Sequence, residues 1–138
     1  MKNIILAILF LISFNSFAQI PVELFQLLDE KDTTSLYFGA EKDPEFPGGH
    51  NAYVNFLQKK FYYPTIARQT GAQGKVFVMF IVEKNGKITN VKATNSVNKH
   101  LEKAAVRLVK KMPNWIPGEQ DDQIVRVLHV LPINFKLE

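Results

Sequence analysis

A run of seven consecutive apolar residues, 76–82, constrains the fold of this chain more than any other feature. The run is rich in the branched and aromatic side chains typical of strands. The Asn85-Gly86 pair behind it is a strong hairpin signal, because both residue types tolerate the positive φ of a tight turn. Residues 73–95 are therefore predicted to form a buried strand, a turn and a second strand with a bulge near Asn90. Such a hairpin is only marginally stable alone, so flanking segments must cover its apolar face.

Three flanking segments show clear periodicity. Apolar residues recur at helical spacing over 51–61 and 101–112, and Asn98 is the expected N-cap of the second helix. Pro64 is expected to open a short helical turn over 65–69. Alternating apolar residues over 123–137 predict a long strand. Pro132 within it has no N–H to donate, so that part of the strand is expected at a sheet edge or a bulge.

The order helix, strand, strand, helix, strand predicts an α+β fold. We expect a three-stranded antiparallel sheet with two helices packed on one face. The single tryptophan, Trp115, is expected to fill the junction between the sheet and the helices. A length of 138 residues accommodates one such domain with a modest core.

Composition argues against several classes of function. The chain has no cysteine, which excludes a disulfide framework, thiol catalysis and cysteine-ligated zinc. The net charge of +4 comes from scattered lysines without interleaved aromatic residues, so nucleic acid is not an expected partner. His50, His100 and His129 lack the spacing of a helical zinc site, and no serine lies in a nucleophile elbow. We therefore expect neither enzymatic activity nor a cofactor or metal site.

The N-terminus has the features of a secretory signal peptide. Lys2 precedes an unbroken apolar run over 4–12, and Ser16 and Ala18 supply the small residues of a cleavage site. The apolar stretch is shorter than the roughly 20 residues that span a bilayer as a helix. We predict a signal peptide over 1–18, a linker or loosely docked arm over 19–45 and a folded, periplasmic domain over 46–138. The alternative is an uncleaved inner-membrane anchor with the domain facing the periplasm.

Short motifs follow one another from about residue 45 to the end of the chain. They are Phe46-Pro47-Gly48-Gly49, Tyr63-Pro64, Gln73-Gly74-Lys75-Val76, Met112-Pro113-Asn114-Trp115 with Pro117-Gly118, and Pro132-Ile133-Asn134-Phe135. Each motif is weak alone, but their order and spacing are specific. Together they resemble the C-terminal domain of TonB energy-transducing proteins, in the form common in Bacteroidetes.

The resemblance implies a role in TonB-dependent transport. TonB C-terminal domains grip a short extended peptide, the TonB box of an outer-membrane transporter, which pairs as an extra strand along the free edge of their last strand. Carried over to this chain, that edge lies ahead of Pro132 and comprises Ile124, Val125, Arg126, Val127, Leu128, His129 and Val130. The segment before Tyr63-Pro64, here Lys60, Phe61 and Tyr62, is the other surface that the family presents to the transporter.

Three alternatives to peptide docking by an exported domain follow from the same residues. Arg126, His129 and Pro132 are also residues that protect an exposed strand edge from aggregation. A retained anchor would make the protein a full energy transducer that contacts inner-membrane motor proteins. A structural module would instead pair the free sheet edges of two copies and form a homodimer.

Overall fold

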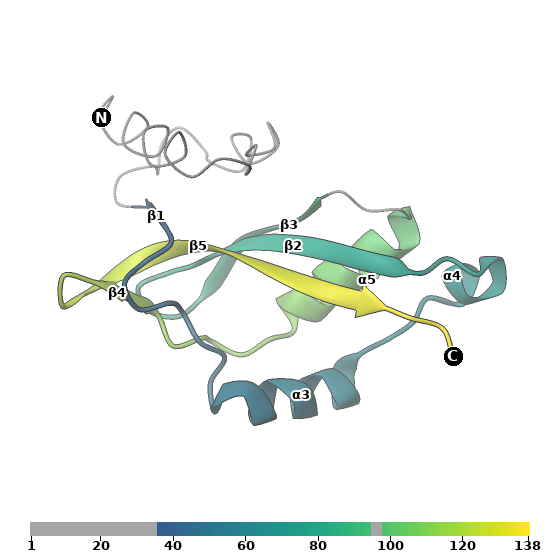
Figure 1. Cartoon of the computed structure of the whole chain (residues 1–138), viewed down its shortest axis with the longest axis horizontal. Coiled ribbons are helices and arrows are strands. Elements are labelled where there is room, and N and C mark those ends of the chain that lie inside the picture. Colours follow the sequence, from purple (N-terminus) through teal and green to yellow (C-terminus); the bar gives the residue numbers. More distant parts are fainter. Residues whose placement is uncertain (1–35, 95–97) are drawn as a thin grey trace.

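One mixed sheet forms the centre of the molecule (Figure 1). The computed structural model describes residues 36–94 and 98–138, so the expected signal peptide and most of the expected linker lie outside the described residues. The strands follow the order β1-β5-β2-β3, and β4 pairs with the start of β5. The elements are β1 (Leu36–Phe38), α3 (Gly49–Lys60), α4 (Thr65–Thr70), β2 (Gly74–Val82), β3 (Ile88–Thr94), α5 (Lys99–Lys110), β4 (Gly118–Gln120) and β5 (Gln123–Phe135).

The apolar run of the sequence forms most of β2, which lies between β3 and β5. Alternate residues of a strand point to opposite faces of the sheet, and β2 is apolar on both. Its residues Val76, Val78, Phe80 and Val82 belong to the main core, together with residues of α5. Met79 and Ile81 form a second buried cluster with Leu36 of β1 and Leu128 of β5. The unbroken apolar run therefore reflects a strand that is buried on both faces.

The hairpin between β2 and β3 turns at the predicted position. Gly86 has a φ of 84°, and its N–H donates to the carbonyl of Glu83 at 2.8 Å. The predicted bulge is confirmed by a register shift between Met79 and Ile81 of β2. Across that shift on β3 lies Asn90, which has a positive φ of 51°. The bulge accommodates one extra residue in β3 and re-aims the strand that follows it.

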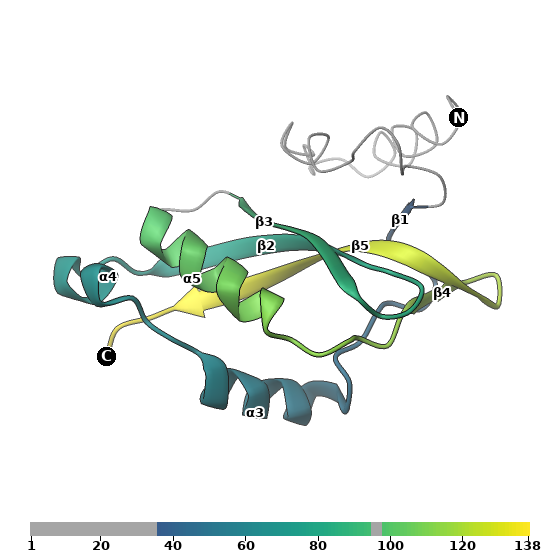
Figure 2. The same ribbon diagram turned by 180° about the vertical axis from the view of Figure 1, so that it is seen from behind.

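The helices lie along the sheet, as Figure 2 shows for α5 in front of β2 and β5. Asn98 caps α5 as predicted, because its side chain accepts hydrogen bonds from the N–H groups of His100 and Leu101. The apolar stripe of α5, including Leu101, Ala105 and Leu108, is buried in the main core. By contrast, α3 has no fully buried residue, although Tyr53 and Phe56 pack against that core. Trp115 is buried as expected, with 6% of its surface exposed.

The α+β fold predicted from the sequence is confirmed, with additions at its margins. The three expected strands are β2, β3 and β5, which are antiparallel neighbours. The described chain adds two three-residue strands, β1 and β4, and the expected helical turn becomes the helix α4. Within residues 36–94 and 98–138, no helix combines the length and apolar character needed to span a membrane.

Candidate functional site

The outer side of β5 is only partly free. On its inner side, β5 pairs with β2 from Val127 to Phe135. On its outer side, β1 pairs in parallel with Arg126, Val127 and Leu128. The sequence predicted an edge that is open along residues 124–130. This prediction is wrong for residues 126–128, because β1 already occupies that part of the edge. The cause is Leu36, an apolar residue of the expected linker that is buried in the second cluster. Among the described strands, none lies beside β5 on the outer side after Leu128.

Backbone groups of alternate β5 residues point to opposite sides of the strand. Pro132 is in register with Phe77 of β2, and a proline is tolerated in a strand where its nitrogen faces away from the neighbouring strand. The backbone N–H and C=O groups of Val130 and Asn134, and the backbone C=O group of Pro132, therefore face the outer side. That side offers two N–H donors, on Val130 and Asn134, and three carbonyl acceptors to an extended chain.

The seven predicted peptide-contacting residues fall into three environments. Ile124, 49% exposed, and the buried Val125 pair with β4. Arg126, Val127 and Leu128 lie beside β1 and are all buried. The remaining two residues, His129 and Val130, have β2 on one side and no described strand on the other. The open edge therefore begins near the end of the predicted stretch and continues beyond it.

Arg126 does not act as an outward charge that guards the edge. It is 8% exposed, and its guanidinium forms a two-point ion pair with the carboxylate of Glu83, in which Nη2 donates to Oε1 at 3.0 Å. The hydrogen bond from Arg126, assisted by one from Thr89, lowers the pKa of Glu83. This pair ties the first half of β5 to the end of β2.

His129 also faces inward. Its imidazole lies against the rings of Phe80 and Trp115, with ring centroids 5.5 and 5.2 Å apart. Burial lowers the pKa of His129, and the nearby Asp43 carboxylate partly opposes that shift. Arg126, His129 and Pro132 were considered as residues that protect the edge from aggregation. Of these three, only Pro132 acts on the outer side, where it lacks an N–H group.

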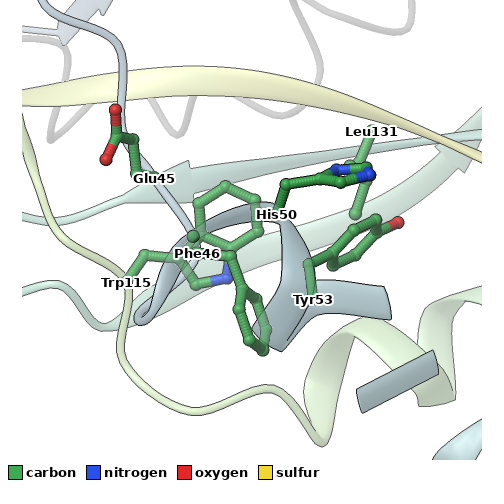
Figure 3. Close-up of a pocket in the computed structure, with 7 residues that line it drawn as sticks. Glu45, Phe46, His50, Tyr53, Trp115 and Leu131 are labelled. Atoms are coloured by element: carbon green, nitrogen blue, oxygen red, sulfur yellow. The ribbon is translucent and has the colours of Figure 1, made fainter. Parts of the chain in front are cut away.

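A cavity of about 330 Å³ lies beside β5 at Leu131 (Figure 3). It is lined by Glu45, Phe46, Gly49, His50, Tyr53, Trp115 and Leu131. Figure 3 shows the imidazole of His50 extending toward Leu131, with the Tyr53 ring beside it. The lining is mainly aromatic and aliphatic, so the cavity suits an apolar side chain. Two of the lining residues, Phe46 and Gly49, belong to the Phe46-Pro47-Gly48-Gly49 motif. This motif was identified in the sequence, but no cavity was predicted from it.

A second cavity, of about 240 Å³, lies between the end of α3 and α5. Its lining includes four lysine or arginine side chains and one histidine, and no acidic residue. The lining residues are Lys60, Tyr62, Pro64, His100, Lys103, Ala104, Arg107, Leu108 and Lys111. We call this surface the basic cavity. Such a concentration of positive charge attracts anionic groups.

Two of the three predicted transporter-contacting residues, Lys60 and Tyr62, line the basic cavity. Phe61 between them turns away and packs against Phe135 at the end of β5, with ring centroids 5.1 Å apart. The contribution of α5 was missed because its lysines have the spacing of an ordinary solvated helix face. Within the described chain, no group of three or more histidine or acidic residues is placed to hold a metal ion.

The family model of the Gram-negative bacterial TonB protein C-terminal domain matches residues 59–137. The chain belongs to this family. TonB C-terminal domains are periplasmic, non-enzymatic interaction modules linked to TonB-dependent transport, and they contact outer-membrane transporters.

Two NMR solution structures of the Helicobacter pylori TonB C-terminal domain are similar to this chain. The first is 24% identical, covers 62% of this chain and 90% of its own, and has a TM-score of 0.47. The second is 22% identical, covers 67% and 89%, and has a TM-score of 0.42. No curated protein matches the chain.

Proposed function

We propose that this TonB C-terminal domain docks the TonB box of an outer-membrane transporter by strand addition along the outer edge of β5. The observation that carries the proposal is the state of that edge: β1 already pairs with its first part, and no described strand covers its second part. An edge that pairs with one extended segment has the spacing and twist needed for another. Main-chain hydrogen bonds would supply affinity, and the cavity at Leu131 would select a side chain of the peptide.

The basic cavity supports a second contact with the same partner. It contains Lys60 and Tyr62, and Phe61 between them packs against Phe135 at the end of β5. A transporter segment that continues past the end of β5 would therefore lie near residues 60–62, which line one side of the cavity. Charge complementarity favours an acidic segment there. The alternative of a membrane-anchored transducer depends on residues 1–18, which lie outside the described residues.

A peptide titration tests the strand-addition proposal. A TonB-box peptide from an outer-membrane transporter of the same organism is added to the ¹⁵N-labelled protein, with a scrambled peptide as the control. We expect amide shifts concentrated in residues 126–134. Shifts confined to α5, or equal shifts with the scrambled peptide, would contradict the proposal.

A matched pair of variants makes the same test at a single hydrogen bond. Val130→Pro removes an outward N–H, whereas Val130→Ala keeps that N–H and also replaces the branched side chain of valine. Because one main-chain hydrogen bond contributes about 0.5–1.5 kcal/mol, the proline variant should bind the peptide about three- to tenfold more weakly than the alanine variant. Equal affinities of the two folded variants would place the peptide elsewhere.

A further inference from the structure

β1 is held on the edge of β5 by one side chain and a few main-chain contacts. Leu36 is 6% exposed and packs in the cluster with Met79, Ile81 and Leu128. The other two residues of the strand, Tyr37 and Phe38, are 37% and 50% exposed. In a parallel pair, the middle residue of one strand bonds to the two neighbours of its partner, so Tyr37 faces the outward groups of Arg126 and Leu128. These are two of the outward groups that a docked peptide would use.

The chain that follows β1 is fixed separately from it. Lys42 exchanges two main-chain hydrogen bonds with Glu119, and Glu45 exchanges two with Ile116. Between this fixed segment and β1 lies Gly39, which has a φ of 77° and open space around the position of a Cβ. A change of direction at Gly39 would therefore release β1 while the segment over 42–45 stays attached. Release would break one short parallel pairing and open the cluster of Leu36, Met79, Ile81 and Leu128, and it would leave the main core intact.

We propose that β1 is an internal ligand of the β5 edge, which a partner strand replaces when it binds. The inference rests on the proposed docking function and specifies the partner. The open part of the edge offers only two N–H groups, because Pro132 contributes none. A partner that also pairs with Arg126 and Leu128 gains further hydrogen bonds, and it must displace β1 to reach them.

The sequence of β1 indicates which partner segments fit. A replacing strand must be extended and run parallel to β5 at this position. It must also carry a large aliphatic side chain where Leu36 lies, so that the side chain fills the space beside Met79, Ile81 and Leu128. Segments with a charged residue there would bury that charge against an apolar cluster and bind poorly.

Occupancy by β1 lowers the apparent affinity of the partner. A binding site that is free in only a fraction of molecules binds with an affinity reduced by that fraction. Weakening β1 should therefore strengthen partner binding, which is the opposite of what the loss of a partner-contacting residue would do.

The test uses two full-length variants and two peptide probes. Leu36→Ser removes the buried anchor of β1, and Phe38→Ser is the matched control on the exposed part of the same strand. The probes are a TonB-box peptide and a synthetic peptide with the sequence of residues 33–40. Because the loss of the Leu36 anchor weakens the competing β1 strand, both probes should bind Leu36→Ser at least about tenfold more tightly than the parent. Phe38→Ser should bind them within about twofold of the parent.

The outcomes separate this inference from the proposed function. Tighter binding of the 33–40 peptide with no TonB-box binding would support the internal ligand and contradict the TonB-box proposal. TonB-box binding that is equal in the parent and in Leu36→Ser would overturn the internal-ligand inference alone.

Hydrogen exchange of the unaltered protein gives an independent readout that does not depend on a variant folding. The Leu128 amide, which faces β1, should exchange at least about tenfold faster than the His129 amide, which faces β2. Equal protection of the two amides would show that β1 does not open separately, and it would overturn the inference.

Discussion

Gly86 connects the hairpin turn to the segment that follows α5. Its carbonyl accepts a hydrogen bond of 2.8 Å from the N–H of Trp115, so the turn and the tryptophan segment lie in direct backbone contact. A Cβ at position 86 would lie 2.1 Å from the carbonyl oxygen of Trp115. The glycine is therefore required by the approach of a second segment as well as by its positive φ of 84°.

Replacement of this glycine should be strongly destabilising. We expect Gly86→Ala to lower the free energy of unfolding by about 3 kcal/mol, because strain at positive φ adds to a backbone clash. Gly71→Ala is the matched control: Gly71 also has a positive φ, of 70°, but no atom lies within 4 Å of its Cβ position. That variant should lose only about 1 kcal/mol. Urea unfolding measures both values, and equal losses would show that the contact with Trp115 adds nothing.

His129 should make stability depend on pH in a mildly acidic range. Burial depresses the pKa of His129 in the folded protein, whereas in the unfolded chain it is about 6.5. Below about pH 6.5 the unfolded state therefore binds a proton that the folded state does not, and stability falls as the pH falls until the folded pKa is reached. Well above pH 6.5 both the folded and the unfolded state are neutral at this residue, and the effect is absent.

Thermal unfolding between pH 8 and pH 5 tests this dependence. His129→Phe keeps an aromatic ring against Phe80 and Trp115 but cannot titrate, so its melting temperature should fall less than that of the parent. His100→Phe, at an exposed position on α5, is the matched control. Glu83 acts in a separate range, because its lowered pKa contributes stability that is present above about pH 4.3 and lost below it. Parallel curves for parent and His129→Phe would contradict the assignment.

At the scale of elements, segments with a local sequence signal were predictable, including the short helix α4, whereas the three-residue strands β1 and β4 were not. The apolar run, the Asn85-Gly86 turn and the Asn98 cap each carry a local physical signal, and β2, its hairpin and α5 form where those signals lie. β1 has only three residues, and Leu36 is buried only because Met79, Ile81 and Leu128 meet beside it. No local pattern carries that information, since the four residues come from distant parts of the chain.

The candidate site divides in the same way. Pro132 indicated an edge from its chemistry alone, and β5 has no described outer neighbour at that point. Arg126 and His129 were harder to interpret, because their roles depend on which way their side chains point. Arg126 pairs with Glu83, 43 positions earlier in the sequence, and His129 lies under Trp115. The basic cavity was missed for a related reason: its two halves, around Lys60 and on α5, become one surface only in the folded chain.

For the molecule as a whole, the two surfaces differ in physical character. The β5 edge binds through main-chain groups and apolar contacts, which depend little on salt. The basic cavity acts through charge, which salt screens over a distance of about 8–10 Å at physiological ionic strength. A partner that engages both should therefore lose part of its affinity as salt rises and retain the rest.

Charge reversal within the cavity should remove the salt-dependent part. Arg107→Glu and Lys84→Glu change the net charge of the protein equally, but only Arg107 lines the basic cavity, whereas Lys84 is exposed in the β2–β3 hairpin. At low salt we expect Arg107→Glu to weaken binding to the intact transporter about three- to tenfold and Lys84→Glu to have little effect. In about 0.5 M salt the two variants should become similar, because screening suppresses the contribution of the cavity. A TonB-box peptide without acidic flanks should bind both variants alike at every salt concentration. Equal weakening by the two variants at low salt would instead mean that net charge, and not the cavity between α3 and α5, attracts the partner.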